Sequence, residues 1–214
     1  MKFEIGPERP ENWQASWPGK YDRFSHFEFA AGIPQVICAV STRKPDGQPN
    51  LCLHAWNTFQ GDGGKFLCLL CGLSGEGHTV ANLRREGDFC VNFLSREHMD
   101  GLRATIAHNG EDEDEFAAGG FHAEASTTVT APRVAESFLV LECLLVSLTQ
   151  LPGQKTWTAV GEIVHAAARE GYMNGVDRRY GPDGFIYNIH SPQDASSGVE
   201  ALCGVATLKI EETY

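Results

Sequence analysis

A loop of small residues is the most informative stretch of this sequence: Gly72-Leu73-Ser74-Gly75-Glu76-Gly77-His78-Thr79-Val80-Ala81-Asn82. The mostly apolar residues before it, 65–71, predict a strand. The residues after it, 79–86, place Val80 and Leu83 at helical spacing, and Gly87 is a common stop residue. The sequence therefore predicts a strand, a flexible loop, and a helix that begins where the loop ends.

The start of this helix is a candidate site for a phosphate group. The first N–H groups of a helix lack partners within the helix and carry a partial positive charge, and glycines let a ligand approach the backbone. The Thr79 hydroxyl and the Asn82 amide can donate hydrogen bonds, and His78 can add positive charge. With Ser74 and Gly77, these residues form the candidate site. The alternative is an ordinary helix with Thr79 as its N-cap, which is the commoner use of such a sequence.

The second candidate segment is His54-Ala55-Trp56-Asn57-Thr58, inside a predicted strand over residues 50–59 that begins with Asn50. Polar side chains beside a Trp can form one wall of a pocket for a flat aromatic ligand, and the strand backbone can bind the edge of the ring. The alternative is a strand whose polar face meets water. Asn50 and residues 54–58 are therefore candidate ligand-binding residues.

Turn signals divide the chain into short strands. Residues 44–49 and 61–64 are rich in Gly, Pro and Asp, and Pro152-Gly153 marks a later turn. The predicted strands are residues 34–41, 50–59, 65–71, 89–93, 138–148 and 156–167. Such a series of strands, with a few helices beside it, predicts an antiparallel barrel or sandwich of the mainly β, α+β type.

Helices are fewer. Beyond residues 79–86, residues 95–108 carry apolar side chains at helical spacing after a Ser95 cap. The acidic residues 111–115 lead into a short capped helical turn over 116–119. Residues 171–192 are rich in Gly, Tyr and Asn and predict a loop. No internal repeat or linker divides the sequence.

The composition bounds the function. With 214 residues, 42% hydrophobic and 21% charged, the chain predicts one globular domain over residues 1–214. A formal net charge of -11 argues against a nucleic-acid partner and against attachment to an anionic membrane. Residues 1–20 lack the apolar run of a signal peptide, and no stretch is long enough to span a membrane, so we expect a cytoplasmic protein. Seven cysteines, mostly within apolar runs, fit that compartment.

Several motifs carry little weight. Cys68 and Cys71 have CxxC spacing, but no second pair follows at zinc-finger distance, and residues three apart on a strand face opposite sides. No metal site is therefore expected, and the thiols are interpreted as structural. No GxGxxG sequence follows a strand, which excludes a Rossmann domain.

Segments spread along the chain resemble the flavin reductase-like family. They are Pro34-Gln35-Val36-Ile37, Asp46-Gly47-Gln48-Pro49-Asn50, Ala55-Trp56-Asn57, His78-Thr79 with Asn82, Gly87-Asp88-Phe89-Cys90-Val91-Asn92, Pro132, Glu136-Ser137, Glu142-Cys143 and Gly161-Glu162-Ile163-Val164-His165. The sequence Gly184-Phe185-Ile186-Tyr187-Asn188-Ile189-His190-Ser191-Pro192 is similar to the longer, flavoredoxin-like members. The resemblance covers about residues 30–192.

The resemblance implies a six-stranded antiparallel Greek-key split barrel with flanking helices, and a homodimer with flavin near the subunit interface. It implies that residues 50–58 contact the isoalloxazine ring and that residues 78–82 hold the phosphate of FMN. Asn92, in the strand similar to the family's, joins the candidate list on the same basis. His165 and His190 are weak functional candidates through the resemblance alone.

Our first hypothesis is an oxidoreductase that passes electrons from NAD(P)H through FMN to a small acceptor or a partner protein. Since the cofactor carries the chemistry, no protein acid–base pair is expected; Trp56 packs near the ring, and backbone amides of residues 55–58 stabilise charge on it. The alternative is an FMN-binding electron carrier without a nicotinamide site, which an acidic surface would suit for docking. A third hypothesis is a split barrel that binds another planar cofactor. The sequence leaves open NADH or NADPH, and FAD is less favoured than FMN.

Overall fold

The computed structural model describes residues 4, 6–8, 31–110, 112–173, 176–189 and 204–212. The chain divides into two compact units, one of Val36–Ile186 with Thr207–Tyr214, the other of Met1–Gln35 with Tyr187–Ala206. Both candidate segments belong to the first unit. That the whole chain forms one domain stays a prediction.

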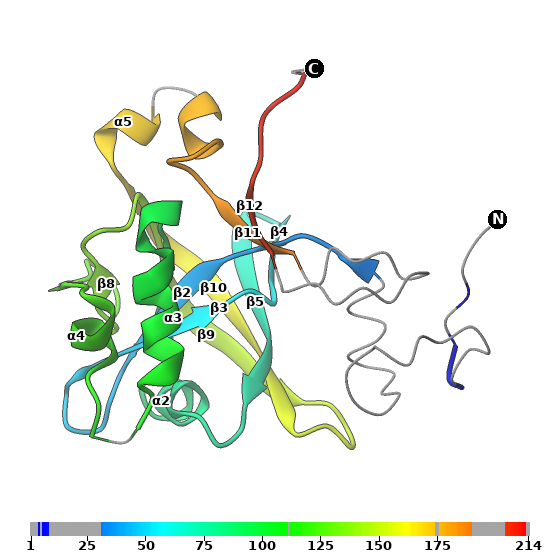
Figure 1. Ribbon diagram of the computed structural model, residues 1–214. Helices are drawn as coiled ribbons and strands as arrows, with labels where there is room; N and C mark the ends of the chain where they lie inside the picture. Colours follow the sequence, from blue (N-terminus) through cyan, green and yellow to red (C-terminus); the bar gives the residue numbers. More distant parts are fainter. Residues whose placement is uncertain are drawn as a thin grey trace. The chain divides into compact units, whose positions relative to one another are not determined.

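A seven-stranded antiparallel sheet forms the centre of the first unit (Figure 1). Its strands follow the order β3-β2-β6-β9-β10-β5-β4. Their bounds are β2 Cys38–Arg43, β3 Pro49–His54, β4 Asn57–Asp62, β5 Lys65–Ser74, β6 Asp88–Phe93, β9 Leu139–Gln150 and β10 Thr156–Ala168. The predicted mainly β architecture is confirmed, with one more strand than expected.

The additional strand arises because the predicted strand over residues 50–59 is broken at Ala55 and Trp56. The Trp56 carbonyl leaves the strand ladder and accepts hydrogen bonds from Cys71 N (2.8 Å) and from His54 Nε2 (2.9 Å). Asn57 N bonds to Ala55 O at 3.0 Å, which turns the chain sharply. Residues 50–59 therefore belong to two strands, β3 and β4, at opposite ends of the strand order.

Helices flank the sheet: α2 His78–Glu86, the 3₁₀ turn η1 Arg96–His98, α3 Met99–Ala107 and α4 Glu115–Gly119. Gly87 ends α2 in the left-handed conformation (φ 74°), as predicted. Asp114 caps α4 by accepting from Ala117 N. Ser95 is the N-cap residue of η1, where its carbonyl accepts from His98 N, but its hydroxyl donates to the Glu97 carboxylate and accepts no capping hydrogen bond.

The predicted loop over residues 171–192 contains short regular elements. These are α5 Glu170–Met173, η2 Val176–Arg179 and β11 Ile186–Ile189. Residues 190–192, including His190, lie outside the described residues. The remaining short strands are β7 Ala123–Glu124, which pairs with β8 Arg133–Val134, and β1 Gln35–Val36 and β12 Gly204–Thr207, which share a sheet with β11.

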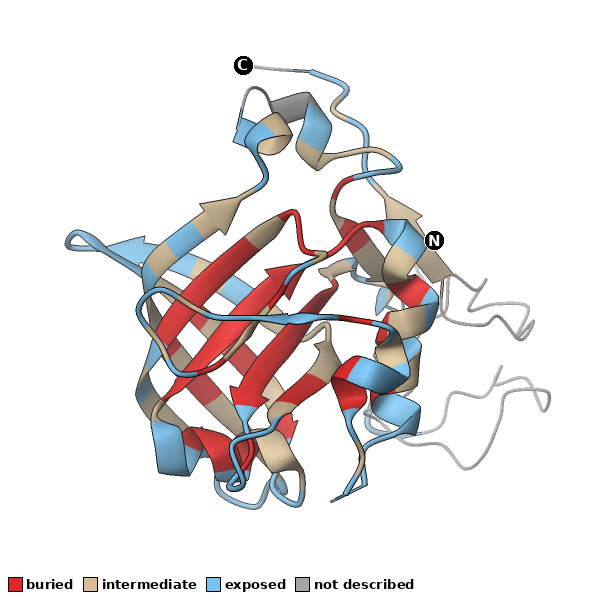
Figure 2. Ribbon diagram, turned by 90° about the vertical axis from the view of Figure 1, so that its left-hand side faces the viewer, coloured by how far each residue is buried: buried red, intermediate tan, exposed pale blue. Residues whose placement is uncertain are grey.

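The core of the first unit lies between the inner faces of the strands, which Figure 2 shows in red. Cys38, Cys68 and Cys143 are fully buried there beside Phe89 and α2's Leu83. Burial raises the pKa of the Cys68 thiol to about 12, so it stays protonated and unreactive. Cys71 is only half-buried, and the two cysteines therefore do not share one environment, as the strand spacing predicted.

Candidate functional site

The loop after β5 leads into α2, whose first turn has no side-chain cap. Gly77 is the N-cap residue of α2, with extended backbone (φ −87°, ψ 157°) and no side-chain cap. The alternative prediction, in which Thr79 is the N-cap, is wrong. The Thr79 hydroxyl has no hydrogen-bond partner within the part of the chain that the structure describes. The first N–H groups of α2 and this hydroxyl are therefore free to bind an anion.

Trp56 packs directly on the last residues of β5, just before this loop. At Gly72 the backbone has φ +70°, and a Cβ built there would lie 2.1 Å from Cε3 of Trp56. Only glycine permits this approach, because any side chain would overlap the indole. With the Cys71–Trp56 backbone hydrogen bond, this contact places the two predicted segments side by side.

A second tryptophan, which the sequence analysis missed, flanks the other side of the loop. A Cβ built at Gly75 would lie 3.0 Å from Nε1 of Trp157, on β10. The guanidinium carbon of Arg84 lies 4.2 Å from the Trp157 ring centre, a cation–π contact that ties α2 to β10. No local pattern points to Trp157, since it reaches the loop only through the pairing of Trp157 with Leu73.

The polar residues around the strand break are held by the backbone. Burial lowers the pKa of His54 below its ordinary value of 6.5, although hydrogen bonds to the backbone of Trp56 and Cys71 act in the opposite direction. Asn57 Nδ2 donates to Val36 O at 2.9 Å, while its Oδ1 is buried without a partner among the described residues. His54, through its hydrogen bond to the Trp56 carbonyl, and the tethered Asn57 hold the backbone around Trp56, and Thr58 is exposed.

Three predicted site residues have structural roles instead. Asn50 and Asn82 are buried, and the Nδ2 atoms of both donate to Thr42 Oγ1, at 3.1 and 2.9 Å. Asn92 is fully buried, donates to Ala39 O and Ser41 Oγ, and accepts from Val134 N. These amides hold strands and loops together, and Asn82 also lines a pocket beside α2.

A pocket of about 420 Å³ lies beside α2 and the β2–β3 turn. It is lined by Lys44, Pro45, Asp46, His78, Ala81, Asn82 and Arg85. The sequence analysis missed Lys44 and Arg85, which add positive charge where only His78 was expected. In a chain of net charge -11, such a concentration of basic groups beside a free helix start favours an anionic ligand.

A family model for the flavin reductase like domain matches residues 30–182, which include both candidate segments and the pocket. The chain belongs to the flavin reductase-like family.

Solved structures share the fold of this family member. A protein described as a flavin reductase with a split barrel domain, from Shewanella frigidimarina, has a TM-score of 0.72 at 20% identity, covering 89% of this chain and 91% of that one. Flavoredoxin from Methanosarcina acetivorans has a TM-score of 0.68 at 18% identity, covering 85% and 88%. An FMN-binding protein from Thermus thermophilus has a TM-score of 0.67 at 19% identity, covering 98% and 99%. The expected split-barrel fold is thereby confirmed.

Other features of the flavin reductase-like chain are remote from the candidate site. His165 lies on β10 opposite Glu142, eight residues beyond Trp157, which is roughly 25 Å along an extended strand. Its assignment as a catalytic candidate therefore finds no support in the geometry. Among the described ranges no helix is long and apolar enough to cross a membrane, and no group of three or more potential ligands is placed to hold a metal ion.

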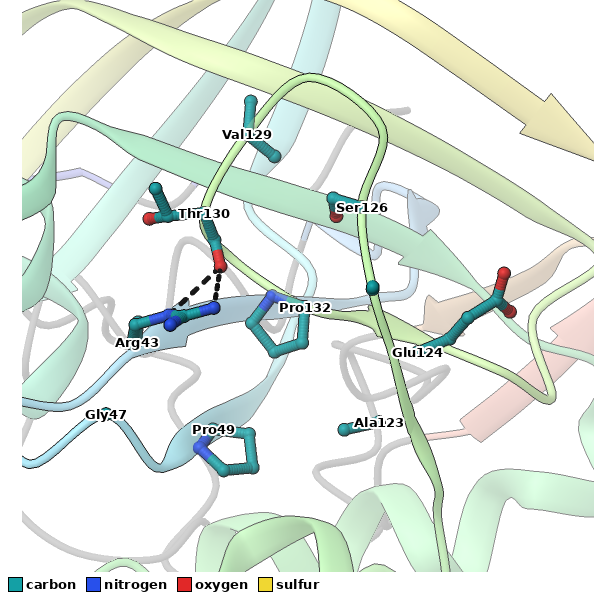
Figure 3. A pocket seen from close by; sticks show the side chains of 10 residues that line it. Arg43, Gly47, Pro49, Ala123, Glu124, Ser126, Val129, Thr130 and Pro132 are labelled. Carbon is teal, nitrogen blue, oxygen red and sulfur yellow. Dashed lines mark hydrogen bonds between the residues drawn. The ribbon is translucent and has the colours of Figure 1, made fainter.

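A second pocket, of about 310 Å³, lies between the β2–β3 hairpin and the loop over residues 123–132 (Figure 3). Arg43 is its one basic side chain, and Nε and Nη2 both donate to Thr130 O, at 3.1 and 2.7 Å. Because the guanidinium is already bound to the protein, this pocket is a weaker candidate than the one beside α2.

Proposed function

We propose that this protein is a flavin-binding oxidoreductase that passes electrons from NAD(P)H through bound FMN to a small acceptor or a partner protein. The observation that carries the proposal is the packing of Trp56 on Gly72. It joins an aromatic strand segment to a loop whose helix start is free to bind a phosphate. A ring and a phosphate at the two ends of one ligand require such a pair of subsites.

The residues present fit FMN. The first N–H groups of α2 and the Thr79 hydroxyl would hold the phosphate, with Lys44 and His78 nearby. Trp56 and the backbone of residues 55–58 would line the ring, where amide dipoles stabilise negative charge. When bound, FMN supplies hydride acceptance and electron transfer. The chain itself binds and orients the cofactor.

The test of the proposal is a visible absorption spectrum of the purified protein, before and after addition of FMN and desalting. A two-banded flavin spectrum that survives the column supports the proposal, and a protein that retains no added FMN contradicts it. Steady-state oxidation of NADH and NADPH by the loaded protein then separates the two hypotheses. An electron carrier of the alternative class would show negligible turnover without a protein donor.

Thr79→Val should weaken FMN binding about tenfold or more, as expected for the loss of one hydrogen bond to a charged group. Riboflavin, which has no phosphate, should bind both proteins equally. Quenching of flavin fluorescence measures both affinities. Thr149→Val, an exposed threonine on β9, is the matched control and should leave both unchanged. An equal loss for both flavins would contradict the phosphate assignment.

We also propose a homodimer and a cytoplasmic location. Leu144 and Val146 are exposed on one face of β9, and Val164 is exposed on the neighbouring β10, which gives an apolar surface that a second copy would cover. Sedimentation should therefore show a dimer, and Val146→Asp should shift it toward monomer. Leu151→Asp, at an equally exposed apolar residue in the β9–β10 turn, should not.

A further inference from the structure

Glu115 is a buried carboxylate next to the pocket beside α2. It is the first residue of α4, its side chain is 0% exposed, and Asp114 caps the helix just before it. In the sequence Glu115 is one of a run of acidic residues, but its charge is turned inward. A fully buried carboxylate must be compensated by nearby cations or donors, because the charge has lost its water.

Two basic side chains from different elements lie against this carboxylate. Lys44 Nζ, from the β2–β3 turn, lies 3.0 Å from Glu115 Oε2, and Lys44 also donates to Glu113 O. His78 Nδ1, from the first residue of α2, lies 3.5 Å from Glu115 Oε1. The Lys44 side chain is only 7% exposed, so the carboxylate also provides this ammonium with its main opposite charge.

Glu115 acts behind the pocket. Lys44 and His78 line it, whereas Glu115 does not. Neither Glu115 oxygen makes a hydrogen bond of good geometry to a described residue, so its hold on the two bases is mainly electrostatic. The other charged lining groups are Asp46 and Arg85, and Arg85 is paired with Glu86.

We infer that Glu115 is a positioning residue for the anion site: it holds Lys44 and His78 beside the first turn of α2, and thereby sets the affinity for the phosphate of the flavin. The inference rests on the proposed function and adds Glu115 to it, as the residue that links Lys44 and His78. The ligand of this anion site is a phosphate monoester. The site forms because the β2–β3 turn, α2 and α4 meet at one buried charge.

Loss of the Glu115 carboxylate should lower the affinity for FMN because Lys44 and His78 are no longer held in position. Without Glu115, the Lys44 ammonium would be buried without its counter-charge, so it must move toward water. The attraction between a base and a phosphate falls with their separation, and a free lysine or histidine must also be ordered again on binding. Removal of the negative charge by itself would raise the affinity for the phosphate, because it removes a repulsion. Lys44 already offsets that charge, so the loss of the fixed positions of the two bases is the larger effect.

The test compares FMN with riboflavin on the full-length protein. Glu115→Gln should lower the affinity for FMN about tenfold and change that for riboflavin less than twofold. Glu115→Asp keeps the charge but shortens the side chain, and it should show a smaller loss of the same kind. Glu142→Gln is the control, because Glu142 is also fully buried and paired with one basic residue, Arg133, but has no contact with the pocket. It should leave the ratio of the two affinities unchanged.

Each possible result of this comparison either supports the inference or overturns it. A ratio that stays the same in Glu115→Gln, through equal losses or through none, would give Glu115 a purely structural role and overturn the inference alone. A higher affinity for FMN would overturn it too. If Glu115→Gln does not fold, an unchanged ratio in Glu115→Asp has the same meaning. A wild-type protein that binds neither flavin would overturn the proposed function, and the inference with it.

Discussion

Glu142→Gln is expected to lower the free energy of unfolding by about 3 kcal/mol at pH 7, because breaking a fully compensated buried ion pair is among the costliest single changes. The Glu142 carboxylate is 0% exposed and accepts from Thr127 N, Thr128 N and the Arg133 guanidinium. These donors lie on the loop over residues 123–132 and on β8. A glutamine at this position would no longer supply the negative charge that pairs with Arg133. Its NH₂ group would also face N–H groups that need an acceptor.

The same network gives the prediction a pH signature. Burial raises the pKa of Glu142, but hydrogen bonds from Thr128, Thr127 and Arg133 outweigh it and lower the pKa from 4.5 to about 2. A carboxyl with a depressed pKa stabilises the fold above its unfolded value and loses that contribution as the pH falls toward the folded value. A depression of this size corresponds to about 3 kcal/mol, present at pH 7 and lost between about pH 5 and pH 2.

Urea denaturation of the wild type and the variant at pH 7 and pH 3 measures both effects. The difference between the proteins should be about 3 kcal/mol at pH 7, with a melting temperature lower by roughly 10 °C, and should shrink at pH 3. Glu162→Gln is the control, since Glu162 pairs with Lys65 at the surface and should contribute less than about 1 kcal/mol. A loss at pH 7 no larger than that of the control would contradict the role of Glu142.

The fold was largely predictable because its signals are local. The left-handed glycines at Gly47, Gly64 and Gly153 turn the chain where the sequence predicted turns. The break at Trp56 was not predictable from neighbours, since it depends on a hydrogen bond from Cys71, fifteen residues away. The mixed apolar and polar pattern of residues 50–59 looks the same in one strand as in two strands that meet at a bend.

The site was predictable only in part, for a related reason. The glycine-rich loop and the helix after it are contiguous, so the sequence identified them. Lys44, Glu115 and Trp157 meet this loop and helix only in the folded chain, and none stands in a motif. Asn92 shows a second limit: a polar residue in a strand can bind a ligand or the protein's own backbone, and the sequence does not distinguish these uses.

Gly72→Ala is expected to weaken FMN binding more than tenfold, because it acts on the contact that joins the proposed ring subsite to the proposed phosphate subsite. A Cβ at this position would lie 2.1 and 2.6 Å from two ring carbons of Trp56, so the indole must leave its place. The φ of +70° adds about 1 kcal/mol of backbone strain for a residue other than glycine. The emission of Trp56 should shift as its surroundings change.

Gly153→Ala separates the two causes. Gly153 has nearly the same backbone conformation, φ +77°, but a Cβ there would meet nothing within 4 Å. It should therefore show only the strain, as a loss of stability of about 1 kcal/mol with unchanged flavin affinity. Flavin titrations and thermal melts of the two variants, at a temperature where both are folded, measure the comparison.

The difference between the two variants isolates the role of Trp56. If Gly72→Ala loses flavin affinity and Gly153→Ala does not, the loss comes from the displaced indole and not from strain. Both parts of FMN should then be affected, since Trp56 adjoins the loop that leads to α2 as well as the strand that faces the ring. A Gly72→Ala protein that keeps full affinity for FMN while its Trp emission shifts would remove Trp56 from the flavin site and leave it as packing for the loop.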